Sequence, residues 1–428
     1  RDQPRSRGLG DVYKRQVLVM GGGIIGLATA YYLNRAGRKV HLIEKETVGG
    51  DAAASYGNCG LLFFSDLPPL CQPGAVADAL VRMTRRTSPL YIKPELDLPK
   101  LMWLLKFAAN CNPAHFKRAV VARHDLFSRS RQLYEALFEN ETIACQWEPQ
   151  GVLLVFKERA LLRQYQRLNA VLRPYGVAAT RLSKTEVLQK EPALADDVCG
   201  AWYHSVDSHL RPETLVRELK AVLMAREVTI TENCALRRLD VSGDAITAAI
   251  TTRGTFTADR YVLATGAWSA PIARQLGVRL PVQPGKGYSL TMERPRSPLR
   301  FPCYFWERSV VATPWQDGLR LGGTMEFSGF NRDFDAVRID NLKSAAAAYL
   351  REPPGQPVLE QWAGVRPMCS DDLPIIGVSP RNPNLYLATG HGMIGMTAAT
   401  ATAELVTHLI TGKNPAFDPV PFSPLRFF

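Results

Sequence analysis

The chain has 428 residues, of which 46% are hydrophobic and 21% are charged, a globular composition with room for two or three domains. These values exclude disordered and fibrous proteins, and no uncharged apolar run is long enough to predict a membrane-spanning helix. The formal net charge is +12, but Lys and Arg are interleaved with Asp and Glu, so we expect no nucleic-acid partner.

The cysteines and histidines are dispersed along the chain. The eight cysteines form no CxxC pair and the seven histidines form no cluster. We therefore expect no metal site and no disulfide framework, and a reducing, cytoplasmic location. Residues 1–16 have no apolar signal core, and a strong strand pattern starts abruptly at Val17. We interpret residues 1–16 as a non-native segment and leave them out of the fold prediction.

The first recognisable unit is strand, helix, strand. Residues 17–20 form a short apolar run, residues 27–35 have helical apolar spacing, and residues 39–44 predict a second strand. Gly37 follows the helix, where a C-terminal cap takes positive φ. This is one βαβ unit of about thirty residues.

The turn after the first strand carries the pattern GxGxxG. Gly21 allows the tight turn, Gly23 lets the backbone approach a pyrophosphate, and Gly26 lets the helix pack closely on the sheet. Glu44 ends the second strand, eighteen residues after Gly26, where a carboxylate accepts hydrogen bonds from ribose hydroxyls. The alternative is an ordinary turn with an exposed Glu.

The rest of the chain alternates between this β/α pattern and a more irregular, β-rich one. Further helices are expected at 98–110, 124–139, 158–172, 212–224 and 396–411, and strands at 151–156, 200–204, 228–231, 261–266 and 384–389, with a β-rich region at 281–360.

We therefore predict an α/β chain, α+β overall, in which a Rossmann-like domain is discontinuous and a second domain is inserted in two pieces. The nucleotide-binding domain is assigned residues 17–67, 208–280 and 361–428. The β-rich substrate-binding domain is assigned residues 68–207 and 281–360.

A second GxGxxG runs from Gly390 through Gly392 to Gly395, between a strand and a helix. Too little chain follows it for a second dinucleotide half with its own acidic residue. A helix N-terminus here suits the N1–C2=O edge of a flavin, where negative charge appears on reduction. This predicts FAD without a separate nicotinamide domain.

Seven segments, in order, resemble the D-amino acid oxidase superfamily of FAD enzymes, most closely the small subunits of bacterial D-amino acid dehydrogenases. They lie at residues 19–33, 55–60, 262–269, 286–290, 362–367, 373–377 and 390–392, so the resemblance covers about residues 17–428. Leu236 stands where the family usually has Val, and Cys59 where it commonly has a small residue.

The resemblance implies a set of residues that bind FAD. The expected cofactor-binding residues are Gly21, Gly23, Ile25, Gly26, Glu44, Lys45, Ser55, Asn58, Gly60, Leu236, Thr265, Gly266, Trp268, Gly390, Gly392, Met393, Gly395 and Met396. We expect FAD to be non-covalent, because Met368 and Ser370 beside Cys369 do not reproduce the motif of relatives that attach flavin through a Cys.

Three residues are expected to carry the catalytic site. Arg366 is predicted to bind the substrate α-carboxylate, as in the similar glycine oxidases, the alternative being an Arg paired with an acid between the domains. Tyr288 either adds a hydroxyl to the carboxylate site or is simply a buried Tyr of the sheet. His391 lies near the flavin by motif position, with a structural or electrostatic role rather than that of a base.

The implied reaction is oxidative deamination of a D-amino acid. Hydride passes from Cα to flavin N5, the imino acid hydrolyses to a 2-oxo acid and ammonia, and a quinone or similar acceptor takes the electrons. The alternatives are a glycine, sarcosine, D-proline or hydroxyproline type oxidase that uses oxygen, and an inactive flavin-binding subunit of a larger complex. A homo-oligomer and a hetero-oligomer both stay open.

Residues 98–110 combine apolar residues with Lys100 and Lys106. Such a helix either lies on anionic lipid or packs on its own domain. Since the resembling dehydrogenases pass electrons to membrane quinone, the first alternative places the protein on the cytoplasmic face of the inner membrane.

Overall fold

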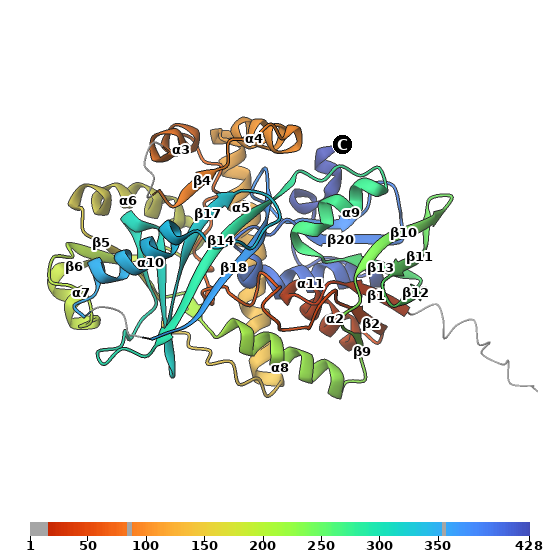
Figure 1. The fold of residues 1–428 in the computed structure, drawn as a ribbon, viewed down its shortest axis with the longest axis horizontal. Coiled ribbons are helices and arrows are strands. Elements are labelled where there is room, and N and C mark those ends of the chain that lie inside the picture. Colours follow the sequence, from red (N-terminus) through yellow and green to blue (C-terminus); the bar gives the residue numbers. More distant parts are fainter. Residues whose placement is uncertain (1–15, 84–87, 353–356) are drawn as a thin grey trace, which may run out of the picture.

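The computed structural model describes residues 16–83, 88–352 and 357–428, so residues 1–15 of the segment expected to be non-native lie outside the described residues. Two sheets dominate the fold, side by side, and each is covered by helices (Figure 1). Two long strands, β14 (Val282–Glu293) and β18 (Val358–Cys369), belong to the second sheet and lie in the middle of the molecule, next to the first sheet.

The first sheet is the predicted dinucleotide-binding sheet. Within the described ranges its strand order is β19-β20-β13-β1-β2-β9, and every neighbouring pair is parallel except β19 with β20. Its strands are β1 (Gln16–Met20), β2 (Lys39–Ile43), β9 (Thr229–Thr231), β13 (Arg260–Leu263), β19 (Ile375–Val378) and β20 (Leu385–Thr389). The central strands β1, β13 and β20 are buried on both faces, as their continuous apolar runs predicted.

Helices cover this sheet and bring distant parts of the chain together. α2 (Ile24–Arg35) joins β1 to β2 and packs against α11 (Gly395–Thr411), which in turn packs against the long helix α5 (Pro113–Asn140). α8 (Pro212–Ala225) packs against α2 from the other side. A small antiparallel sheet of β10 (Leu236–Ser242), β11 (Ala245–Thr251) and β12 (Gly254–Phe256), together with α9 (Ser269–Gln275), completes this part.

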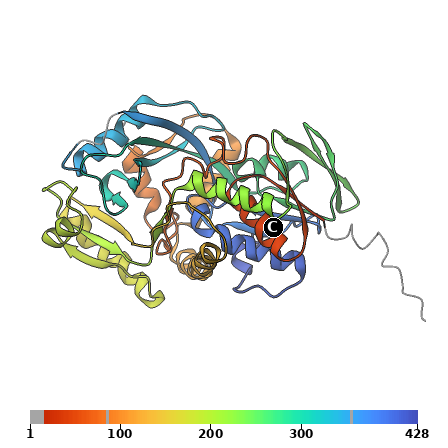
Figure 2. The ribbon, with the colours of Figure 1, turned by 90° about the horizontal axis from the view of Figure 1, so that it is seen from below.

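The second sheet has nine strands among the described residues, in the order β18-β14-β17-β16-β15-β5-β7-β6, with β4 (Leu90–Ile92) paired to β17. The others are β5 (Val152–Phe156), β6 (Thr180–Ser183), β7 (Gly200–His204), β15 (Cys303–Phe305), β16 (Val310–Trp315) and β17 (Gly318–Phe327). Seen from below in Figure 2, β5 to β7 lie at the end of the molecule far from the first sheet.

Two features of the second sheet differ from the sequence pattern. The region 281–360 contains a helix, α10 (Ala336–Tyr349), which packs on β14 and β17 through residues such as Leu342 and Ala345. The expected domain boundary at residue 361 falls inside β18, because β18 pairs with β14 along almost its whole length. The helices α6 (Arg159–Leu172) and α7 (Lys184–Lys190) lie beside β5 to β7.

The helix α4 (Leu98–Asn110) has two different faces. Trp103 is buried and its Nε1 donates to the Met368 carbonyl at 2.9 Å, and Lys100 is buried in an ion pair with Glu95. Leu98, Leu101, Met102 and Leu105 are exposed on the other face. The helix therefore packs against β18 through Trp103 and still presents an apolar surface. None of the helices in the described ranges is long and apolar enough to cross a membrane.

Candidate active site

A large cavity, about 1220 Å³, is lined by residues of both sheets. Its walls come from the β1–α2 turn, the segment 52–59, residues 234–237 and 264–268, the N-terminus of α11, and strands β14, β17 and β18. The carboxyl ends of the parallel strands of the first sheet open into it, which is where ligands bind in open α/β sheets. Most of the residues predicted to form the site line this cavity.

The first glycine turn has the close geometry that the motif predicts. Gly21 has φ +115°, and a Cβ added there would lie 2.4 Å from the Ala264 carbonyl oxygen. A Cβ added at Gly26 would lie 1.8 Å from the Gly21 carbonyl oxygen. Gly26 does not line the cavity. Its role is to let α2 approach β1, and this places the N-terminus of α2 against the cavity.

Gly23 differs from these two glycines, because neither its backbone conformation nor a neighbouring atom prevents a side chain at this position. It has φ −73°, and the nearest heavy atom to an added Cβ would be Ser55 Oγ at 3.6 Å, an ordinary contact. Gly23 is the N-cap of α2 and lines the cavity, and no side chain caps the helix from that position. Room without a side chain at a helix N-terminus fits the pyrophosphate of a dinucleotide.

Glu44 follows β2 and lines the cavity. Its Oε2 accepts from the Gly22 amide at 2.5 Å and its Oε1 from the Glu46 amide at 3.2 Å. Each carboxylate oxygen keeps lone pairs for a further donor. Gly22, which the motif does not specify, has a role here, since a Cβ at this residue would lie 3.0 Å from Glu44 Cβ and 2.7 Å from Val48 Cγ2.

Other residues that were predicted to bind FAD lie near the end of β2 or elsewhere on the cavity wall. Lys45 Nζ lies 3.6 Å from the centre of the Trp268 ring, a cation–π contact at the cavity wall. Leu236 begins β10 beside the end of β2, because the Cys234 amide donates to the Glu44 carbonyl at 2.7 Å. Ile25, Leu236, Thr265 and Gly266 all line the cavity.

The segment 52–60 crosses from the first sheet to the second. Ser55 Oγ accepts from the Ile24 amide at 3.3 Å, and Asn58 Oδ1 accepts from the Gly60 amide at 2.7 Å. Ser55 and Asn58 line the cavity, and Gly60 does not. Gly60 packs on the Leu210 carbonyl oxygen, which an added Cβ would approach to 1.9 Å. Cys59 Sγ occupies the space above Gly322, where an added Cβ would lie 2.1 Å from the sulfur.

The second glycine turn also contributes to the wall of the cavity. Gly392, Met393, Gly395 and Met396 line the cavity and lead into α11, which no side chain caps at its N-terminus. Gly390 does not line the cavity and packs near Ile375 and Cys369. A helix N-terminus therefore faces the cavity here, as the motif predicted for the flavin edge.

Arg366 extends from β18 into the cavity. Its Nη1 donates to the Thr324 carbonyl at 3.0 Å, and in the described part of the chain no Asp or Glu forms an ion pair with it. Burial lowers the pKa of Arg366, although a guanidinium stays charged in proteins. The alternative of an Arg paired with an interdomain acid has no support in this geometry. A cation without a counterion in a cavity suits an anionic ligand.

Two backbone features make room for Arg366. Gly287 on β14 lies against the guanidinium, since an added Cβ would be 2.0 Å from Nη1. Thr324 has φ +69° at a register shift in the β14–β17 ladder, which turns its carbonyl toward Arg366. Positive φ at a β-branched residue is rare and strained, and such strain concentrates at functional sites.

Tyr288 lines the cavity, but its hydroxyl is engaged elsewhere. The hydroxyl donates to Glu326 Oε2 at 2.8 Å, and Glu326 also pairs with Lys286 at 2.9 Å. Burial and the hydrogen bond to Glu326 raise the pKa of Tyr288, so the hydroxyl keeps its proton. A neutral Tyr has one proton to donate, so this geometry disfavours the expected bond from Tyr288 to a substrate carboxylate.

His391 is buried in the turn before α11. Its Nε2 is 2.9 Å from Thr402 Oγ1, and burial lowers its pKa to about 3. A neutral imidazole at physiological pH cannot act as a proton donor of the imidazolium type. The geometry favours the structural role over a catalytic one.

One charged cluster in the cavity was not predicted. Arg123 on α5 donates to Asp66 at 3.0 Å and to Asp372 at 2.9 Å, and all three line the cavity. Burial raises the pKa of both carboxyls, that of Asp372 to about 6. The residues are far apart in the sequence and no motif connects them, so no local pattern could have revealed the cluster.

Comparison with known proteins agrees with this arrangement. The family model described as FAD dependent oxidoreductase (DAO) matches residues 16–409. A D-amino acid dehydrogenase of Methylobacterium radiotolerans is 32% identical, covering 93% of this chain and 96% of that protein. A D-amino acid dehydrogenase of Granulibacter bethesdensis is 30% identical, covering 94% and 97%.

Solved structures share the fold. Glycine oxidase from Geobacillus kaustophilus superposes with a TM-score of 0.76 at 24% identity, covering 96% of this chain and 98% of that one. L-Proline dehydrogenase from P. horikoshii superposes with a TM-score of 0.73 at 18% identity, covering 97% and 98%. The chain belongs to the DAO family of FAD-dependent oxidoreductases, which confirms the resemblance and the predicted fold class.

The glycine geometry predicts that one substitution weakens FAD binding and that another lowers protein stability. Gly23→Ala should leave the stability of the FAD-free protein unchanged and weaken FAD binding about tenfold or more, because the methyl group takes space only from the ligand. Gly26→Ala should destabilise the FAD-free protein by about 1–3 kcal/mol, because the methyl group meets backbone. Thermal unfolding and FAD titration measure both. Wild-type FAD affinity in Gly23→Ala would contradict the assignment.

Proposed function

We propose that this protein is an FAD-dependent dehydrogenase that oxidatively deaminates D-amino acids to 2-oxo acids and ammonia. The observation that carries the proposal is the guanidinium of Arg366, which faces the large cavity. Among the described residues, Arg366 has no acidic partner. An α-carboxylate is its natural bidentate partner. The names of the curated relatives support the D-amino acid as substrate.

The residues around the cavity fit FAD. Gly23 and the N-terminus of α2 would hold the pyrophosphate, Glu44 the adenosine ribose, and the N-terminus of α11 the flavin. Bound FAD supplies the two-electron acceptor for hydride from the substrate Cα. Cys369 supports non-covalent binding, because it is buried outside the cavity lining and its thiol donates to Asp371 Oδ1 at 3.1 Å.

Arg366 acts by orientation. Two parallel N–H donors fix the plane of the carboxylate, and thereby the direction in which the Cα–H bond points. The Thr324 carbonyl and Gly287 hold the guanidinium in place. Leu154 of β5, Tyr304 of β15 and Trp306 just after β15 add apolar and aromatic side chains to the cavity wall.

The first test is an anaerobic absorbance titration of the flavin band. D-Amino acids should bleach the band, and the corresponding L-amino acids should not, because Arg366 fixes one face of Cα. Glycine, sarcosine and both hydroxyproline epimers complete the panel. Aerobic turnover that produces hydrogen peroxide would support the oxidase alternative. Turnover that requires an added quinone would support the dehydrogenase. A bound flavin that no amino acid bleaches would support the inactive subunit.

A conservative substitution tests the carboxylate site. Arg366→Lys keeps the charge but loses the two-pronged geometry, so KM for the D-amino acid should rise about tenfold or more while FAD content stays at the wild-type level. Arg351→Lys is the matched control, because Arg351 is exposed, pairs with Asp196 and does not line the cavity. Unchanged kinetics in Arg366→Lys would remove this residue from the substrate site.

We further propose that the exposed face of α4 rests on an anionic membrane surface, so that a quinone-type acceptor reaches the cavity there. Leu105 of α4 and Leu80 of α3 (Ala75–Met83) are exposed and also line the cavity, and α3 and α4 both lie at the upper edge of the molecule in Figure 1. Lys106 is exposed on the same helix, whereas Lys100 is buried and takes no part.

Vesicle binding tests this surface. The double variant Leu101→Gln, Leu105→Gln should bind anionic vesicles about tenfold more weakly than wild type in a cosedimentation assay, since two apolar side chains no longer enter the lipid. Leu359→Gln is the control, because Leu359 is equally exposed but lies on β18. Equal binding of all three proteins would speak against the proposed contact.

A further inference from the structure

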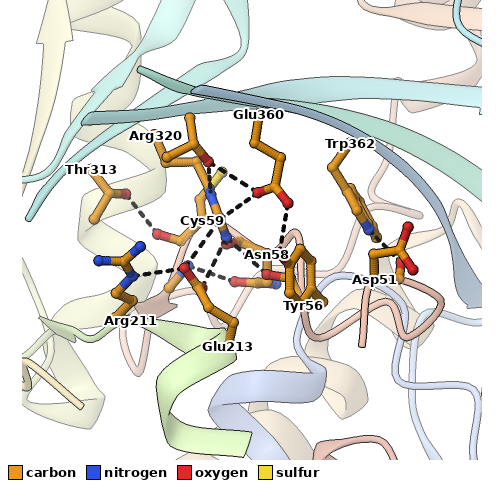
Figure 3. Close-up of polar contacts among 12 residues, drawn as sticks. Asp51, Tyr56, Asn58, Cys59, Arg211, Glu213, Thr313, Arg320, Glu360 and Trp362 are labelled. Carbon is orange, nitrogen blue, oxygen red and sulfur yellow. Dashed lines mark hydrogen bonds and ion pairs between the residues drawn. The ribbon is translucent and has the colours of Figure 1, made fainter. Parts of the chain in front are cut away.

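Arg320 is a buried cation between the two domains. It extends from β17, is 1% exposed, and lies with its guanidinium 4.6 Å from the centre of the Trp315 ring. Its Nη atoms contact Glu213 of α8 at 3.2 and 3.3 Å and Glu360 of β18 at 3.4 Å. Its Nε donates to Thr291 Oγ1 at 3.0 Å. Figure 3 shows this network between the strands above and the segment 51–59 below.

The same guanidinium holds backbone carbonyls of the segment that lines the cavity. Arg320 Nη1 donates to the Tyr56 carbonyl at 2.8 Å and to the Asn58 carbonyl at 3.1 Å. Thr313 Oγ1 on β16 donates to the Cys59 carbonyl at 2.7 Å (Figure 3). The Tyr56 hydroxyl donates to Glu360 Oε1 at 2.6 Å, which fixes the side chain of the same segment.

The peptide geometry gives these bonds a consequence on the other side of the segment. In a trans peptide the N–H points opposite to the preceding C=O. With the carbonyls of Tyr56 and Asn58 directed to Arg320, the amides of Gly57 and Cys59 point away from it. Neither amide donates to an acceptor in the parts of the chain that the structure describes. Both residues line the cavity, and Arg320 does not.

We propose that Arg320 is a positioning residue that turns the amides of Gly57 and Cys59 toward the flavin. This inference rests on the proposed function. Two amide donors directed at a flavin stabilise the negative charge that it gains on reduction, and so raise its reduction potential. Arg320 touches neither substrate nor cofactor, and its effect passes through the backbone it holds.

The neighbouring Arg211 provides a matched control. Its Nε donates to Glu213 Oε1 at 2.7 Å, so it shares a carboxylate with Arg320, but it holds no carbonyl of the segment 51–60. Lys replaces the charge of either arginine but not the several donors of a guanidinium. Arg320→Lys therefore releases the segment and keeps the network charged, whereas Arg211→Lys changes the network alone.

The experiment measures the reduction potential of bound FAD in the purified holoenzymes by equilibration with a reference dye, together with kcat and KM. Arg320→Lys should shift the dye equilibrium about tenfold toward oxidised FAD, about 30 mV for a two-electron couple. It should lower kcat about tenfold, with KM changed less than about threefold, because the donors act on the flavin rather than on substrate binding. Arg211→Lys should match wild type in all three values.

The possible outcomes separate this inference from the proposed function. A folded Arg320→Lys enzyme with wild-type potential and kcat overturns the positioning role. If Arg320→Lys does not fold, Arg320→Gln, which removes the guanidinium donors to the Tyr56 and Asn58 carbonyls and leaves Glu213 paired with Arg211, takes its place with the same readouts, and an unchanged potential then overturns the inference. A wild-type protein that binds no FAD refutes the proposed function itself, whereas FAD-bound wild type with an unaltered variant removes only Arg320.

Discussion

Among the residues that the structure describes, Arg366 has no acidic partner, and the strands β14 and β17 beside it are shaped to accommodate its guanidinium. A guanidinium is costly to remove from water, and the other buried arginines among the described residues are paired: Arg123 with two aspartates, Arg320 with two glutamates and Arg338 with Asp335. Gly287 and the strained carbonyl of Thr324 accommodate Arg366 in place of a carboxylate. The positive charge of Arg366 is thus available at the cavity, and an anionic ligand would complete the pair.

The sequence predicted the geometry of the first glycine turn well, because this geometry is local. The spacing of Gly21, Gly23 and Gly26 and the position of Glu44 follow from one strand, one turn and one helix, and the structure places them as expected. The helix α10 escaped prediction because its apolar face is recognisable only against the strands that it covers. The division into domains and the roles of the site residues stay predictions.

Longer-range partners explain what the sequence did not reveal. The hydroxyl of Tyr288 is engaged by Glu326, thirty-eight residues away, and Arg320 reaches a segment more than 260 residues away. The sequence around Tyr288 and around Arg320 gives no indication of these distant partners. The path of β18 is similar, since its residues read as the start of the final nucleotide-binding segment until its pairing with β14 is known.

The contact between Cys59 and Gly322 has a meaning for how this family varies. The sulfur fills the space that a side chain at position 322 would need, since an added Cβ would lie only 2.1 Å from it. The two positions, far apart in the sequence, therefore share one small volume. A relative with a smaller residue at position 59 is free to enlarge position 322, and one that keeps Cys is not. Substitutions at positions 59 and 322 should therefore be correlated among relatives, because the two side chains compete for the same space.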